Sequence, residues 1–208
     1  PGVKTGDEYV HGKELRRLEL RQYIYKLDNT IMHWVDTESH IGTHVEGPSH
    51  YVKGGKDISS VSIERFIGEA VVLNFTGKLP KKGKPQPITP ADFEKAGVKK
   101  NDIVLMWSPY AEGESPYLSV EGAKWLRKKG IKLLGFQNVG VESPVTPPTP
   151  GFPKSMETHE LLKDDICLVE LLVNLDKIGK KRVLFIGLPI RIAGLDSSWI
   201  RAIALEEL

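Results

Sequence analysis

The residues best suited to chemistry are three histidines and a glutamate in the first quarter of the chain. Six histidines occur among the 208 residues, and three of them, His40, His44 and His50, fall within eleven residues that also contain Glu46. Imidazole binds transition metals and can carry a proton near neutral pH. A carboxylate adds an oxygen ligand or a general base. The segment therefore predicts a metal centre, a proton-transfer site, or both.

The distances between these side chains depend on the conformation of the backbone. Residues that disfavour a helix are frequent in the segment, namely Gly42, Thr43, Val45, Gly47 and Pro48. In an extended backbone, His44 and Glu46 point to the same side about 7 Å apart and could bind one ion. His40 and Glu46 would be about 20 Å apart on a straight strand, too far to share an ion. We therefore expect a bend at Gly42 or Gly47, because glycine permits one.

Further metal ligands must come from distant parts of the chain, and two residues qualify. His159 is the only histidine after position 50. Glu170 lies within the apolar run 166–172, where a buried carboxylate needs a partner such as a metal. Simpler interpretations exist: His159 as a structural residue of a helix, Glu170 on a solvent face or beside a lysine, and the clustered histidines as surface hydrogen-bonding groups. The joint occurrence of all these residues favours the metal site.

The composition of the chain limits which metals it could bind, which partners it could have and where in the cell it could act. The single cysteine, Cys167, excludes an internal disulfide and a thiolate cage, so imidazole and carboxylate would hold zinc, manganese or iron(II). With 29 Lys+Arg against 27 Asp+Glu, the net charge of +2 offers no field for nucleic acid or anionic lipid. The apolar runs fall short of the roughly 20 residues that span a bilayer. We expect a small-molecule substrate, no nucleic-acid or membrane partner, and a cytoplasmic location.

An α/β framework is expected to position these residues. A chain of 208 residues with 40% hydrophobic residues suits one globular domain over 1–208. The runs 18–27 and 31–35 predict a hairpin, and 40–50 has the composition of a loop. Helices are predicted after the cap Thr89, over 120–129 between Ser119 and Gly130, and over 156–163. Buried strands are predicted over 69–75, 102–107, 131–136, 166–173, 183–192 and 200–205, which gives a mixed central sheet.

The motif resembles that of a known enzyme family. Residues 40–50, HIGTHVEGPSH, are similar to the HxGTHxDxPxH motif of the cyclase-family metal hydrolases, which include bacterial kynurenine formamidase (arylformamidase) and isatin hydrolase. His159 and the following Glu-Leu-Leu resemble the family's HxxLL block, residues 169–175 resemble its VExLxNL block, and 201–204 fit its final strand. The blocks stand in the family's order and span most of the chain.

The resemblance implies a swivelling β/α/β fold and a homodimer or homotetramer. It implies one or two divalent metal ions, with Zn²⁺ the leading candidate and Mn²⁺ the alternative, held by five residues: His40, His44, Glu46, His159 and Glu170. It assigns catalytic roles to His50, as the proton carrier, and to Glu170. The implied reaction is hydrolysis of the C–N amide bond of a small N-formyl or N-acyl aryl amide, or of a cyclic amide, by metal-activated water.

Some positions depart from the family pattern. Glu46 stands where the family has Asp, Glu142 stands where many members have Asp, and residues 197–199 replace a Gly-Ser-Pro-like turn. The additional methylene of Glu46 can alter the number or identity of the metals. Four aromatic residues could line a substrate pocket, although aromatic side chains more often belong to the core: Trp34, Trp107, Phe152 and Trp199.

Two other functions fit the same residues. A non-haem iron(II) oxygenase could use His44, Glu46 and His159 as a two-His-one-carboxylate triad. The capped helices count against it, because such enzymes commonly use an all-β barrel. A family member that binds metal without catalysis is the other alternative. Metal-dependent amide hydrolysis is the leading hypothesis.

Overall fold

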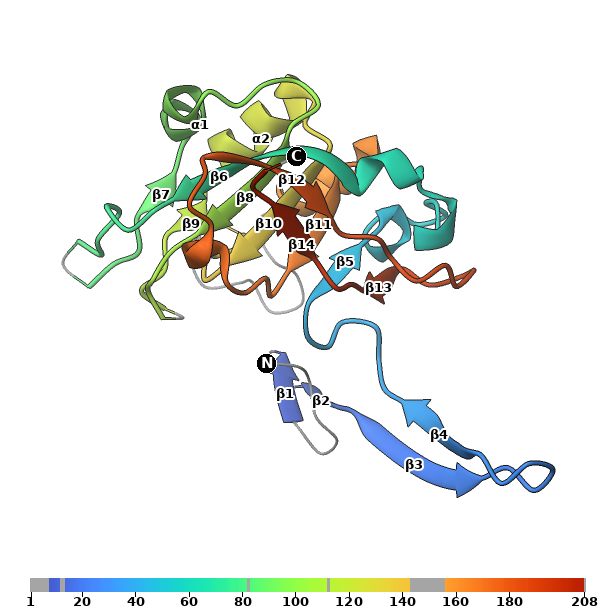
Figure 1. The fold of residues 1–208 in the computed structure, drawn as a ribbon. Coiled ribbons are helices and arrows are strands. Elements are labelled where there is room, and N and C mark those ends of the chain that lie inside the picture. Colours follow the sequence, from blue (N-terminus) through green and yellow to red (C-terminus); the bar gives the residue numbers. More distant parts are fainter. Residues whose placement is uncertain (1–7, 12–13, 82, 112, 143–155, 208) are drawn as a thin grey trace.

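The central element of the structure is a mixed β-sheet of eight strands (Figure 1). The computed structural model describes residues 8–11, 14–81, 83–111, 113–142 and 156–207. The strand order in the sheet is β13-β5-β11-β10-β8-β6-β12-β14. The expectation of an α/β fold with a mixed central sheet is therefore confirmed.

Four parallel strands form the middle of this sheet, and antiparallel strands flank them on both sides. The parallel strands are β6 (Ile67–Asn74), β8 (Ile103–Trp107), β10 (Leu133–Gln137) and β11 (Cys167–Glu170). On one side lie β5 (His44–Glu46) and β13 (Ser197–Trp199), and on the other β12 (Arg182–Ile186) and β14 (Ile203–Leu205). The near-continuous apolar sequences of the parallel strands match their burial on both faces.

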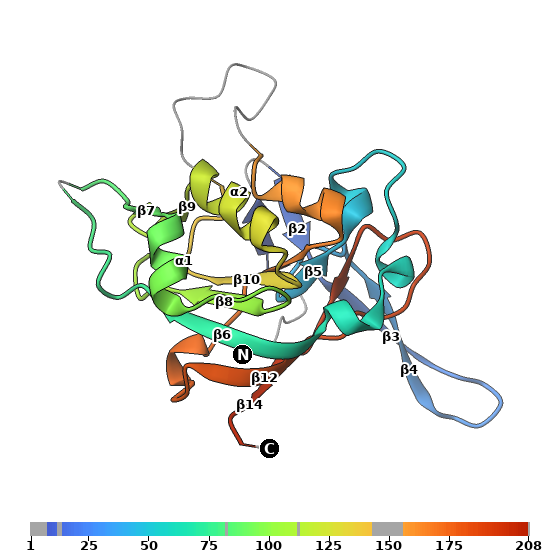
Figure 2. The same ribbon diagram turned by 90° about the horizontal axis from the view of Figure 1, so that it is seen from above.

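Helices cover one face of the sheet (Figure 2). Helix α1 (Pro90–Ala96) begins with a capping box between Thr89 and Asp92, and α2 (Val120–Lys129) begins where the Ser119 side chain accepts a hydrogen bond from the amide of Gly122. The short 3₁₀ helix His159–Asp164 lies beside α2. Side chains of these helices pack on Val104, Met106, Leu134, Phe136 and Leu168 of the sheet. This apolar layer fixes the 3₁₀ helix, and with it His159, above β11.

A second core lies on the opposite face. It contains Val45, Ala70, Leu105, Val169 and Phe185 from the strands, together with residues of the short 3₁₀ helices Ile58–Ser60 and Leu175–Lys177. A third 3₁₀ helix, Ile63–Arg65, precedes β6 and has no buried residue. Successive side chains of β5 and β11 therefore point to opposite faces of the sheet. Val45 and Val169 enter this second core, and the residues on either side of them point to the helix-covered face.

The N-terminal strands form two ribbons outside the sheet. Strands β1 (Glu8–His11) and β2 (Glu14–Arg17) pair, as do β3 (Glu19–Ile24) and β4 (Ile31–Asp36), and the short strands β7 (Pro87–Ile88) and β9 (Tyr117–Leu118) form a third pair. The β3–β4 hairpin confirms the turn expected at Asp28 and Asn29, and it projects away from the sheet in both views. Every residue of β4 is exposed.

Several predicted elements differ from those observed. The segment 40–50 was expected to be a loop, but its centre is strand β5, paired on both sides, and Pro48–His50 is a 3₁₀ turn. The strand expected over 166–173 stops at Glu170, because Leu171 adopts a left-handed φ of 55°. The strand expected over 183–192 stops at Ile186, where Gly187 and Pro189 follow, and proline cannot donate a hydrogen bond to a neighbouring strand. The predicted helix over 156–163 is the 3₁₀ helix His159–Asp164, and much of the expected loop 138–153 lies outside the described residues.

Among the helices described, none has both the length and the apolar character needed to cross a lipid bilayer.

Candidate metal centre

The His40–His50 segment folds back on itself at glycine, as its sequence predicts. Gly42 has a φ of 68°, in the left-handed region that suits glycine, and this separates His40 from strand β5. The extended backbone over β5 then places His44 and Glu46 on the same side of the sheet. After Gly47 the chain turns into the 3₁₀ helix that ends at His50. Three imidazoles are thereby directed at the Glu46 carboxylate.

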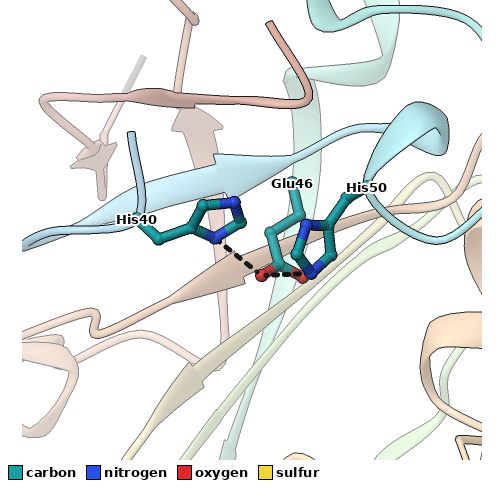
Figure 3. Close-up of side chains that lie close together, drawn as sticks. All are labelled: His40, Glu46 and His50. Carbon is teal, nitrogen blue, oxygen red and sulfur yellow. Dashed lines mark ion pairs between the residues drawn. The ribbon is translucent and has the colours of Figure 1, made fainter. Parts of the chain in front are cut away.

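Glu46 is the centre of the cluster. Its Oε1 lies 3.2 Å from Nδ1 of His40, 3.5 Å from Nε2 of His50 and 3.7 Å from Nε2 of His44. Its Oε2 lies 3.6 Å from Nε2 of His159, the first residue of the 3₁₀ helix His159–Asp164. Figure 3 shows His40 and His50 approaching the carboxylate from two sides. The structure therefore brings together all four histidines singled out in the sequence.

Glu170 joins the same cluster across the sheet. It lies directly opposite His44 in the antiparallel pairing of β5 with β11, so both side chains point to the helix-covered face. One ligand atom each from His44, Glu46 and Glu170 falls within 4.8 Å of the others, and the same holds for His40, Glu46 and His50. All five expected metal ligands and the expected proton carrier thus surround one point.

Two of these histidines are oriented by acceptors behind them. The Nδ1–H of His44 donates to the backbone carbonyl of Gly42 at 2.8 Å, and the Nδ1–H of His159 donates to Oε1 of Glu142, also at 2.8 Å. Each acceptor assigns the proton to Nδ1 and leaves Nε2 with its lone pair facing Glu46. Such outer acceptors are the usual companions of metal-binding histidines. The sequence drew attention to Glu142 only as a departure from the family pattern.

Asp196 is the site residue that the sequence analysis missed. Its Oδ2 lies 2.8 Å from Nε2 of His40 and 2.8 Å from Nδ1 of His50. Burial raises the pKa of Asp196, but the hydrogen bonds from the two histidines outweigh this and lower it to about 2. Asp196 precedes β13, which pairs with β5, and it stands 156 residues from His40, so no local pattern links them. Its only signal in the sequence is its place directly before the altered turn at 197–199.

The carboxylates and imidazoles of the cluster shift one another's pKa values. Burial raises the pKa of Glu46, but the neighbouring imidazoles of His40 and His44 lower it, and the net shift is downward. Burial raises the pKa of Glu170, and the charge of Glu46 raises it further. Burial disfavours the charged forms of His40 and His159, but their carboxylate partners reverse this and the pKa of each is raised. The negative charge of Glu46 is therefore stabilised, and a second negative charge beside it is disfavoured unless a cation is present.

The donor set fits a divalent metal. Two polar atoms of the cluster are buried and have no hydrogen-bond partner among the described residues, namely Nε2 of His44 and Oε2 of Glu46. An unsatisfied buried polar atom is costly, and a metal ion would satisfy both. Imidazole nitrogens and carboxylate oxygens without thiolate suit Zn²⁺ or Mn²⁺.

The aromatic residues expected near the site are mostly elsewhere. Trp34 lies on the β3–β4 ribbon with 64% of its surface exposed, and Trp107 packs against the core on the sheet face opposite the histidines. Phe152 lies outside the described residues. Trp199 is directly opposite His44 in the pairing of β13 with β5, so one of the four aromatic residues does border the site.

Comparisons with known proteins agree with this geometry. The Cyclase family model matches residues 9–143. Kynurenine formamidase of Erythrobacter litoralis is 30% identical over 173 residues, which cover 81% of this chain and 74% of that protein. Isatin hydrolase A from Labrenzia aggregata superposes with a TM-score of 0.71 at 20% identity, covering 92% of this chain and 84% of that chain. A protein from Bacillus stearothermophilus, described as a predicted metal-dependent hydrolase, superposes with a TM-score of 0.71 at 18% identity, over 98% and 94% of the two chains.

These similarities test the expectations drawn from the motif. The solved structures confirm the expected fold, and the kynurenine formamidases among the relatives confirm the expectation of an amidohydrolase. The family match contains the whole segment from His40 to His50, whereas His159 and Glu170 lie beyond it. Because this match extends over more than half of the sequence, the chain belongs to the Cyclase family.

Proposed function

We propose that this protein hydrolyses the C–N amide bond of a small N-formyl or N-acyl aryl amide, or of a cyclic amide, with the help of a divalent metal. The main support for the proposal is that four imidazoles and the carboxylate of Glu170 surround the buried carboxylate of Glu46. The substrate class comes from relatives named kynurenine formamidase and from fold neighbours named isatin hydrolase.

The proposed metal ligands are His40, His44, Glu46, His159 and Glu170. A divalent ion bound by them would lower the pKa of water and polarise the substrate carbonyl. We propose Zn²⁺ as the resident metal, with Mn²⁺ as the alternative, because the donor atoms are nitrogen and oxygen only. The longer reach of Glu46, compared with the Asp of the family motif, bears on whether one or two ions bind.

His50 is the proposed proton carrier. About 30% of its side chain is exposed, against 2% for His44, so substrate can reach it. Its Nε2 faces Glu46 at 3.5 Å and its Nδ1 contacts Asp196. In the proposed reaction the oxygen of water bonds to the carbonyl carbon, the water proton moves to Nε2 of His50, and the C–N bond breaks as that proton passes to the leaving nitrogen.

Glu170 is proposed to act both as ligand and in catalysis. It stands opposite His44 and within reach of Glu46, so in catalysis it would act at the metal-bound water. Trp199 lies on the other side of His44 and offers an aromatic surface to the ring of an aryl amide.

A second copy of this chain is the proposed partner of the β3–β4 ribbon. Two cross-strand pairs, Leu20 with Val35 and Ile24 with Ile31, share one face of the ribbon, and all four side chains are exposed. An isolated two-stranded ribbon is only marginally stable in water, so covering this face would stabilise it. A homodimer or homotetramer is also what the family resemblance implies. A cytoplasmic location is proposed as well, since Cys167 is the single cysteine.

The function is tested by assaying the purified protein, loaded with Zn²⁺ or Mn²⁺, on N-formylkynurenine and on isatin. We expect hydrolysis of at least one substrate. The variant His50→Ala should lower kcat by about 100- to 10,000-fold, the usual contribution of general acid–base catalysis, with its metal content unchanged. The control Lys128→Ala, at an exposed position of helix α2, should retain full activity.

Two results would contradict the proposed function. Metal-loaded protein that hydrolyses no member of an amide and ester panel would support a binding protein without catalysis. Turnover that requires iron(II) and consumes oxygen would support the oxygenase built on His44, Glu46 and His159.

A further inference from the structure

One carboxylate oxygen contacts two histidines with different proposed roles. Oδ2 of Asp196 lies 2.8 Å from Nε2 of His40 and 2.8 Å from Nδ1 of His50. The two rings are neighbours, with centroids 4.4 Å apart. They are brought together from opposite ends of the motif by the bend at Gly42 and the turn after Gly47.

The chemistry of this contact determines which ring nitrogens carry protons. An ionised carboxylate oxygen accepts hydrogen bonds and donates none, so both facing nitrogens must be N–H groups. Oε1 of Glu46, 3.2 Å from Nδ1 of His40, is a second carboxylate acceptor, so a cation bound between them would be needed to leave Nδ1 with its lone pair. A neutral His50 has its lone pair on Nε2, 3.5 Å from the same oxygen. With a metal bound beside Glu46, this single oxygen of Asp196 would therefore fix the tautomers of both rings and leave both lone pairs on the side of the metal.

Asp196 is itself held in place from the other side. Its Oδ1 accepts a hydrogen bond from the Ser39 hydroxyl at 3.3 Å, and the Ser197 hydroxyl donates to Ser39 at 2.6 Å. Its backbone carbonyl accepts from the amide of Gly47 at 2.8 Å, directly after Glu46 in the chain. The carboxylate thus has little freedom to turn away from the histidines.

We propose that Asp196 is a positioning residue that holds His40 as a metal ligand through Nδ1 and His50 as a proton carrier through Nε2. The role of His50 as proton carrier rests on the proposed function, whereas the tautomers of the two rings and the affinity for metal do not. Asp196 would couple the metal centre to proton transfer, because both rings depend on one acceptor. Outer-sphere carboxylates of this kind typically change metal affinity or activity by about 10- to 100-fold when they are removed.

The first test uses the wild-type protein loaded with Zn²⁺ and needs no substitution. Two-bond ¹H–¹⁵N NMR correlations distinguish the imidazole tautomers, and a pH of about 9 keeps ordinary imidazoles neutral. We expect the Nε2–H form for His40 and the Nδ1–H form for His50. The opposite tautomer at either ring would overturn the proposal.

The second test removes the carboxylate. In Asp196→Ala the backbone bond to Gly47 remains available, and we expect both tautomer preferences to weaken. Affinity for Zn²⁺, measured by competition with a chromophoric chelator, should fall by about 10- to 100-fold. The matched control is Asp57→Ala, which removes a side chain that accepts from the amide of Gly194 in the same loop and, among the described residues, bonds to no histidine. Its metal affinity should equal that of the wild type.

The results separate this proposal from the proposed function. Wild-type tautomers and wild-type zinc affinity in Asp196→Ala would overturn the positioning role, as would an equal loss of affinity in Asp57→Ala. If the expected tautomers and affinity loss are found but the wild type hydrolyses no amide, the positioning role stands and only the proposed function fails.

Discussion

Glu142 holds His159 by two contacts from one oxygen: Oε1 lies 2.8 Å from the ring Nδ1 and 3.0 Å from the backbone amide nitrogen of the same residue. The ring and the backbone of His159 are therefore fixed together, and Nε2 is left facing Oε2 of Glu46 at 3.6 Å. Glu142 thus orients the proposed ligand His159 on its short 3₁₀ helix, as the carbonyl of Gly42 orients His44 on strand β5.

Replacing Glu142 should weaken metal binding without removing a ligand. In Glu142→Ala the Nδ1–H of His159 loses its acceptor, so we expect Zn²⁺ affinity to fall by about 10- to 100-fold. Competition titration with a chelator measures this. The control is Glu157→Ala, which breaks only a partly exposed ion pair with Lys124 and should leave the affinity unchanged. Wild-type affinity in Glu142→Ala would show that His159 is oriented by other contacts or is no ligand.

Local signals in the sequence predicted the elements that carry the site. The limits of α2 follow from the Ser119 cap and from Gly130, whose φ is 73°, because both effects act within one helical turn. A bend at Gly42 or Gly47 was predicted because glycine permits one, and Gly42 adopts a left-handed φ of 68°. His159 and Glu170 were candidates from their residue types and positions, and the family resemblance then linked both to the first motif.

Contacts between distant segments could not be predicted in this way. Strand β5 has only three residues in a Gly- and Pro-rich segment, and it is a strand because β11 and β13 pair with it on both sides. Asp196 meets His40 and His50 only when β13 is placed beside β5. The extent of the domain, 1–208, stays a prediction.

Asp57 should stabilise the protein in a pH-dependent manner. Its carboxylate accepts hydrogen bonds from the backbone amides of Ser60 and Gly194 and from the hydroxyl of Ser59. These bonds, with that from Ser60 the largest cause, lower the pKa of Asp57 to about 2. The folded-state pKa lies below the unfolded value, so the stabilisation is present above about pH 4 and is lost as the pH falls toward 2.

Chemical denaturation of the wild type and of Asp57→Asn across this range measures the effect. The wild type should have the larger free energy of unfolding at about pH 5, and the difference should shrink as acid protonates Asp57. A difference that is constant from neutral pH to pH 2 would show that the carboxylate charge of Asp57 contributes nothing.

Cys167 should be unreactive in the folded protein. It is fully buried in β11, and burial raises the pKa of its thiol to about 12. The thiolate is the reactive form, and almost none is present at pH 8. We expect Ellman's reagent to detect no thiol in the native protein and one thiol per chain in urea. Rapid stoichiometric reaction of the native protein would contradict the burial of β11.

The ribbon should determine the oligomeric state. Ile24 and Ile31 are cross-strand partners with 60% and 64% of their surfaces exposed within one chain. The double variant Ile24→Lys, Ile31→Lys should therefore fold normally but sediment as a monomer, whereas the wild type should sediment as a dimer or tetramer. Leu79→Lys, at an exposed leucine outside the ribbon, is the control and should keep the wild-type state. A wild type that is monomeric at all accessible concentrations would contradict the proposed assembly.

The proposed binding of a divalent metal among the residues that surround Glu46 can be tested by anomalous diffraction from crystals grown with Zn²⁺. We predict an anomalous peak at the zinc edge about 2.0–2.2 Å from Nε2 of His44, Nε2 of His159 and the carboxylate oxygens of Glu46 or Glu170. The peak should be absent from crystals of Glu46→Gln. Wild-type crystals with no zinc peak in this cluster, or with zinc only at other residues, would contradict the claim.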